Sequence, residues 1–148
     1  MKSIEEKVKE ICAEQFPDFS YVFESWYEAD KVISRLKSLP AIICVLPVSG
    51  TLEEHINTGR MKDAENTAIA FVDKVRRDAN GFDNYTAYNS MKKSAKKFIK
   101  AVNKDQYFKP LSGRQSYEVI YEQYSTIVTG IYLDLNLEQA EGVCDDEQ

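Results

Sequence analysis

The feature that most constrains this fold is a long amphipathic segment at residues 84–104. Apolar side chains recur there every three or four residues, which predicts one continuous helix: Tyr85, Tyr88, Met91, Ala95, Phe98, Ile99 and Val102. Such a helix is about 30 Å long, and its apolar stripe must be covered by a second layer of the protein. We therefore expect Phe98 and Ile99 to be buried against that layer.

A second helix is predicted at the N-terminus. Ser3 and Glu6 have the spacing of a capping box, in which each side chain bonds the other residue's backbone. One apolar stripe follows at helical spacing: Ile4, Val8, Ile11 and Cys12. Pro17 is expected to end this helix, because proline cannot continue the helical hydrogen bonding.

Five further segments have the composition or alternation of β-strands. They are residues 19–26, 41–46, 66–75, 116–124 and 126–137. Residues 41–46 are uninterruptedly apolar, which indicates a strand covered on both faces, and residues 28–38 favour a short helix. We expect Ser49 and Gly50 to turn the chain, and residues 51–65 to form a polar arm broken near Thr58 and Gly59. Asn80 and Gly81 are a further turn signal.

This order of elements predicts an α+β fold, with a mostly antiparallel sheet packed by the N-terminal helix and the long helix. The 148 residues, 43% of them hydrophobic and 29% charged, suit one globular domain. We place that domain at residues 1–137. Residues 138–148 are predicted to form an acidic, flexible C-terminal tail.

Composition also limits the function classes. The net charge of −5 disfavours a general nucleic-acid binder, which usually carries a basic surplus. Three widely spaced cysteines indicate neither a disulfide framework nor a zinc site. The charged first residues predict no signal peptide. The longest apolar stretch, residues 40–48, is about half of the ~20 residues that a membrane helix needs, so we expect no membrane partner.

Candidate catalytic residues are few. His55 is the only histidine, and pairing with Cys44 would make a thiolate nucleophile. Cys44, however, lies within the apolar strand, where a thiol is usually an inert small hydrophobic group. The acidic residues around His55 lack the spacing of a calcium loop, and no nucleotide-binding or hydrolase motif occurs. We expect no catalytic residue, cofactor or metal ion.

The long helix also carries a basic face made of six lysines: Lys92, Lys93, Lys96, Lys97, Lys100 and Lys104. Removing their charge from the net charge of −5 leaves −11 on the rest of the chain. One interpretation is a simple solvated face. The other is electrostatic complementarity, in which this face meets an acidic surface of a neighbouring protomer. On that interpretation we expect Lys92, Lys96 and Lys100 to line or border a contact between subunits.

Two aromatic residues in a predicted loop, Tyr107 and Phe108, are further interface candidates. An aromatic side chain offers a large apolar surface, and tyrosine adds a polar tip, a combination common at protein interfaces.

Three segments carry a resemblance to a known family: residues 21–26 (YVFESW), 39–47 (LPAIICVLP) and 66–74 (NTAIAFVDK). They resemble small proteins encoded among bacteriophage head–tail genes. The order of elements is similar to that of tail-terminator, or tail-completion, proteins. The resemblance implies a subunit made in the bacterial host cytoplasm that assembles into a ring, commonly a hexamer, in the virion.

In that family the ring caps the tail tube or joins it to the neck. The resemblance implies contacts with copies of the chain and with neighbouring head–tail proteins, and nucleic acid only where it passes through the ring. The polar arm, with His55, corresponds to a loop directed at a neighbouring ring. Two other hypotheses stay open: a standalone bacterial regulatory or toxin-neutralising binding module, and a small enzyme whose site forms between subunits.

Overall fold

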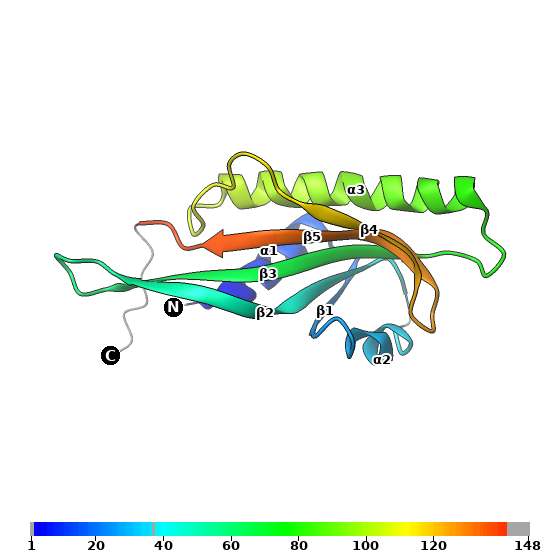
Figure 1. Ribbon diagram of the computed structural model, residues 1–148, viewed down its shortest axis with the longest axis horizontal. Helices are drawn as coiled ribbons and strands as arrows, with labels where there is room; N and C mark the ends of the chain where they lie inside the picture. Colours follow the sequence, from blue (N-terminus) through cyan, green and yellow to red (C-terminus); the bar gives the residue numbers. More distant parts are fainter. Residues whose placement is uncertain (1, 37, 142–148) are drawn as a thin grey trace.

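A five-stranded sheet with helices on both faces forms the protein (Figure 1). The computed structural model describes residues 2–36 and 38–141. Its elements are α1 (Ile4–Gln15), β1 (Ser20–Glu24), α2 (Ala29–Ile33), β2 (Ala41–Glu54), β3 (Met61–Lys74), α3 (Gly81–Lys104), β4 (Tyr117–Gln123) and β5 (Val128–Glu138). The strand order is β1-β2-β3-β5-β4. Among the described strands only the β1–β2 pair is parallel, which confirms the mostly antiparallel α+β fold.

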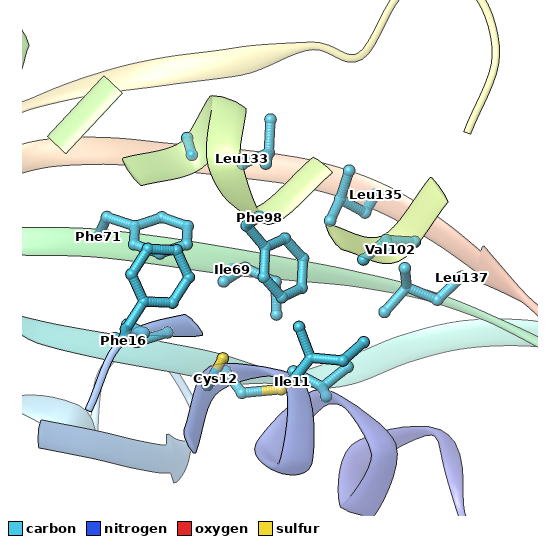
Figure 2. Close-up of a cluster of buried hydrophobic side chains, with 14 of the residues drawn as sticks. Ile11, Cys12, Phe16, Ile69, Phe71, Phe98, Val102, Leu133, Leu135 and Leu137 are labelled. Carbon is cyan, nitrogen blue, oxygen red and sulfur yellow. The ribbon is translucent and has the colours of Figure 1, made fainter. Parts of the chain in front are cut away.

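The main core lies between the sheet and the two longer helices. Figure 2 shows Phe98 and Val102 of α3 meeting Ile11 of α1 above the sheet, and the Phe98 ring lies 5.9 Å from the Phe71 ring. Phe98 is fully buried, as its place on the apolar stripe predicts. Ile99 is only half-buried at the margin of this core.

A second, smaller core lies on the opposite face, under α2. Val22, Ile33 and Ile43 belong to it. Because α2 has only five residues, it covers one end of this face. The part of the face over β3 and β5 carries small or polar residues instead, including Ala68 and Asn66.

Both longer helices begin at side-chain caps. The Ser3 hydroxyl accepts a hydrogen bond from the Glu6 N–H at 3.2 Å and donates to the Glu6 carboxylate. At α3, Asn80 and Asp83 form a reciprocal capping box. The Asn80–Gly81 pair therefore starts the helix instead of forming a separate turn, and α3 begins three residues before residue 84.

The β2–β3 hairpin is longer than its sequence predicts. Ser49 and Gly50 do not turn the chain, because a β-bulge between Val45 and Ser49 lets β2 continue to Glu54. A Cβ atom on Gly50 would lie 2.5 Å from the Ala64 carbonyl oxygen, so only glycine fits this close approach. The reversal comes later, at residues 55–60, around the expected break at Thr58 and Gly59.

The ordered domain extends past residue 137. β5 includes Glu138, and Gln139 is buried and forms a β-bridge with Phe108. The Gln139 N–H also donates to the Asp63 carbonyl oxygen at 2.9 Å. The rest of the predicted tail, from residue 142 onward, lies outside the described residues. Within the described ranges, no helix has both the length and the apolar character needed to cross a membrane.

Candidate assembly surface

Half of the β2–β3 hairpin projects from the domain. We call residues 46–64 the arm. β2 is buried over residues 41–45 and exposed from residue 46 to its end. Figure 1 shows the outer part of the arm, past the pair formed by Ala64 and Glu138, extending beyond the ends of α3 and β5. Four aliphatic side chains are exposed along it. Val48 at 86%, Leu52 at 71% and Ile56 at 95% are the most exposed, and Leu46 is 39% exposed.

The tip of the arm is an ordered turn. The His55 N–H donates to the Arg60 carbonyl oxygen at 2.8 Å, and the Gly59 N–H donates to the His55 carbonyl oxygen at 2.8 Å. Gly59 has a φ of +70°, a conformation that favours glycine. The turn therefore presents Ile56 and the exposed His55 from a defined backbone.

Side-chain bonds across the strands fix the base of the arm. The Asn66 amide donates to the Ser49 hydroxyl at 2.8 Å, and the Asn136 amide donates to the Asn66 side-chain oxygen at 2.6 Å. Lys62 forms an ion pair of 2.9 Å with Glu138. The hydrogen bond between these two groups raises the pKa of Lys62 and lowers the pKa of Glu138. The arm is thus held in line with the sheet.

A second exposed surface follows the outer strand β4. We call it the aromatic edge, and it consists of Tyr117, Val119 and Tyr121, which share one face of β4 and are 41%, 38% and 48% exposed. The alternation of these three residues is visible in the sequence. Their position on an edge strand depends on the order of strands in the sheet, in which β4 is outermost.

The aromatic edge is joined to the basic helix by Lys92. The Lys92 ammonium lies 5.5 Å from the centre of the Tyr88 ring and 5.6 Å from the centre of the Tyr117 ring. The two tyrosine hydroxyls share a hydrogen bond of 3.1 Å. That bond, together with the Lys92 ammonium, lowers the pKa of Tyr117. Lys92 is therefore a positive charge fixed beside an exposed aromatic strand.

The six lysines of α3 do not form a single face. The Lys97 ammonium donates to the Gln15 carbonyl oxygen at 2.9 Å and so caps the C-terminal end of α1. Four lysines are exposed and form no ion pair with any residue that the structure describes: Lys93, Lys96, Lys100 and Lys104. Of the three predicted contact residues, Lys96 and Lys100 are free to meet a partner and Lys92 borders the aromatic edge.

The expectation that Tyr107 and Phe108 face a partner is wrong. Phe108 is almost fully buried, and its ring packs against the Tyr107 ring at 4.9 Å. The Tyr107 hydroxyl donates to the Lys2 carbonyl oxygen at 2.6 Å and accepts from the Gln139 amide at 2.9 Å. The loop after α3 folds under the end of β5, so both rings belong to the core.

The structure keeps Cys44 and His55 apart. Cys44 lies in the main core, where burial raises the pKa of its thiol to about 12, and the same cause raises the pKa of Cys12 to about 12. His55 lies at the arm tip, on the order of 30 Å further along the strand direction. Among the described residues, no three histidine, cysteine, aspartate or glutamate side chains gather as a metal site.

Comparison of the chain with protein-family models and with curated proteins finds no match.

Proposed function

We propose that this chain is a structural subunit of a bacteriophage virion, and that it assembles with copies of itself into an oligomeric ring at the neck or tail. It works through protein–protein contacts with its own copies and with neighbouring head–tail proteins. The observation that carries this proposal is the arm, an ordered hairpin whose outer part projects past the domain and along which Val48, Leu52 and Ile56 are exposed.

Exposed aliphatic side chains on a rigid arm favour association. Burying one side chain of this size contributes about 1.5–3 kcal/mol. A flexible loop would offset part of that gain through the entropy lost on ordering. Here the turn at His55 and the bonds at Asn66 order the arm in advance.

Other observations support a structural role over catalysis. The two described thiols are buried with raised pKa values, so neither is a ready nucleophile. The only histidine, His55, is exposed at the arm tip, and among the described residues it belongs to no cluster of potential metal ligands. Three segments resemble small proteins encoded among bacteriophage head–tail genes, and the order of elements is similar to that of tail-terminator proteins. This resemblance favours a ring subunit among the possible assemblies.

The test is the oligomeric state of the protein and of an arm variant. We expect the parent to form a closed oligomer by size-exclusion chromatography with light scattering, and rings by negative-stain electron microscopy. The variant Val48→Ser, Leu52→Ser, Ile56→Ser should be a folded monomer, with an unchanged far-ultraviolet circular dichroism spectrum.

The matched control is Tyr27→Ser. Tyr27 is 83% exposed but lies beside α2, toward the other end of the molecule from the arm (Figure 1). This variant should assemble as the parent does. A parent that stays monomeric at every concentration would contradict the ring and favour the standalone binding module.

A further inference from the structure

β4 presents unpaired backbone groups along the open edge of the sheet. The Asp134 N–H donates to the Ser116 carbonyl oxygen at 2.9 Å. In the β4–β5 register these two residues lie directly opposite each other. Because antiparallel hydrogen bonding alternates, Tyr117 and Val119 direct their N–H and C=O groups away from β5. The strand carries neither lysine nor proline, the residues that usually protect an open edge.

The arm has a matching open edge on β2. The bond from the His55 N–H to the Arg60 carbonyl oxygen sets the same alternation. Gly50, Leu52 and Glu54 therefore direct their backbone groups away from β3. β1 pairs with β2 only over residues 41–45, so no described strand covers this edge.

The two edges also match in the direction of their side chains. Val119 lies opposite Ile131 and on the sheet face covered by α1 and α3. Leu52 lies opposite Asp63. Asp63 is two residues from Glu65 and so shares its face, and Glu65 lies opposite Leu137, which is on the face covered by α1 and α3. Leu52 is therefore on that face too. On both edges, therefore, the residues whose backbone groups point outward have side chains on the face covered by α1 and α3. Pairing the two edges would continue one sheet across two copies, with this face on the same side in both.

We infer that residues 50–54 of the arm of one copy add as an antiparallel strand to β4 of a second copy, with Leu52 opposite Val119. This inference rests on the proposed function and names its contact. Because the arm and β4 are different parts of each copy, the contact is heterologous and can repeat around a closed ring.

The register follows from the side chains that it brings together. Leu52 packs on Val119. Two residues away, Glu54 lies opposite Tyr117, whose ring is the one beside the Lys92 ammonium. In the other direction, Gly50 lies opposite Tyr121 and leaves room for its ring. Pairing two β4 strands with each other would instead leave the aliphatic residues of the arm and Glu54 without partners.

Cysteine cross-linking between two singly substituted proteins tests this contact. Leu52→Cys and Val119→Cys are each made in a Cys144→Ser background; both sites are exposed, so both variants should fold. After mixing under mild oxidation, we expect a disulfide-linked dimer that contains one chain of each kind. Neither variant alone should give this product.

A Val119→Pro variant gives a second readout. Its missing N–H is one that faces away from β5, so the sheet within each copy should survive while the addition of a strand is blocked. We expect a folded monomer, whereas Val119→Thr should assemble as the parent does.

Each other outcome overturns the inference. Cross-linking of Val119→Cys alone would show that β4 pairs with itself. Light scattering that shows oligomers without the mixed cross-link would remove this contact and leave the proposed ring standing. A parent that is monomeric throughout would remove both.

Discussion

The Thr129 hydroxyl donates a hydrogen bond of 2.9 Å to the side-chain oxygen of Asn84, and both residues are buried. The same hydroxyl accepts from the Glu122 N–H at 3.1 Å. Glu122 has a φ of +49° and lies at the irregular end of β4. One hydroxyl thus links the start of α3, the strand β5 and the bulge that ends the aromatic edge.

Thr129→Val should lower the free energy of unfolding by roughly 1–3 kcal/mol, because it removes the partner of the buried Asn84 side-chain oxygen and the acceptor of the Glu122 N–H. Urea denaturation measures this change. Thr86→Val, at an exposed position of α3, is the control and should change the stability by less than about 0.5 kcal/mol. Equal effects of the two substitutions would show that the Thr129 bond contributes nothing.

Phe98→Ala should lower the free energy of unfolding by roughly 3–5 kcal/mol, because it opens a cavity between α1, α3 and β3. Chemical denaturation by guanidinium, followed by circular dichroism, is the measurement. Tyr85→Ala is the control: Tyr85 belongs to the predicted apolar stripe of the same helix, but its side chain is 57% exposed, so its loss should open no cavity. A loss below about 1 kcal/mol at Phe98 would contradict the helix-on-sheet core.

Replacing Lys92, Lys96 and Lys100 with glutamate should weaken assembly while each copy stays folded. The substitutions place negative charge where Glu54 of a second copy is expected. Raising the salt concentration should weaken assembly of the parent in the same direction, since screening acts over about 8 Å at physiological ionic strength. Light scattering across a salt series measures both effects.

The charge-matched control replaces three exposed lysines outside α3 with glutamate: Lys9, Lys31 and Lys74. It should assemble nearly as the parent does at the same salt concentration. If it dissociates equally, net charge and not the position of the lysines controls assembly. If the α3 variant assembles normally at low salt, the basic face is only solvated.

Glu65→Gln should stabilise the protein at neutral pH. Burial, and then the nearby Asp63 carboxylate, raise the pKa of Glu65 in the folded state. The folded state therefore holds the proton more tightly than the unfolded chain, and ionised Glu65 opposes folding at pH 7. Stability of the parent should rise as the pH falls through the raised pKa, and the advantage of glutamine should vanish below the ordinary glutamate pKa of about 4.3.

Urea denaturation of parent and variant at pH 7 and near pH 4 tests this sign. Glu14→Gln, an exposed position of α1 outside the proposed contact, is the control. Destabilisation by Glu65→Gln at both pH values would mean that the carboxylate makes favourable contacts that outweigh its burial.

Local sequence patterns are sufficient to predict α1, α3 and the buried part of β2, residues 41–45. Each depends on short-range properties: the cap at Ser3, the helical spacing of Met91 and Phe98, and the uninterrupted apolar run after Pro40. These patterns also predict one α+β domain, because a long apolar stripe and several strands must cover each other. The sequence therefore determines the layers of this protein.

The tertiary structure alone decided which surfaces are left open. Ser49 and Gly50 have the composition of a turn, yet they continue a strand because residues 61–66 lie opposite and the bulge absorbs the extra length. The position of Phe108 after α3 predicts an exposed loop residue, yet Phe108 is buried against the end of β5. The open edge at Val119 depends on β4 being the last strand of the sheet. All three follow from contacts between residues far apart in the chain, which local periodicity does not encode.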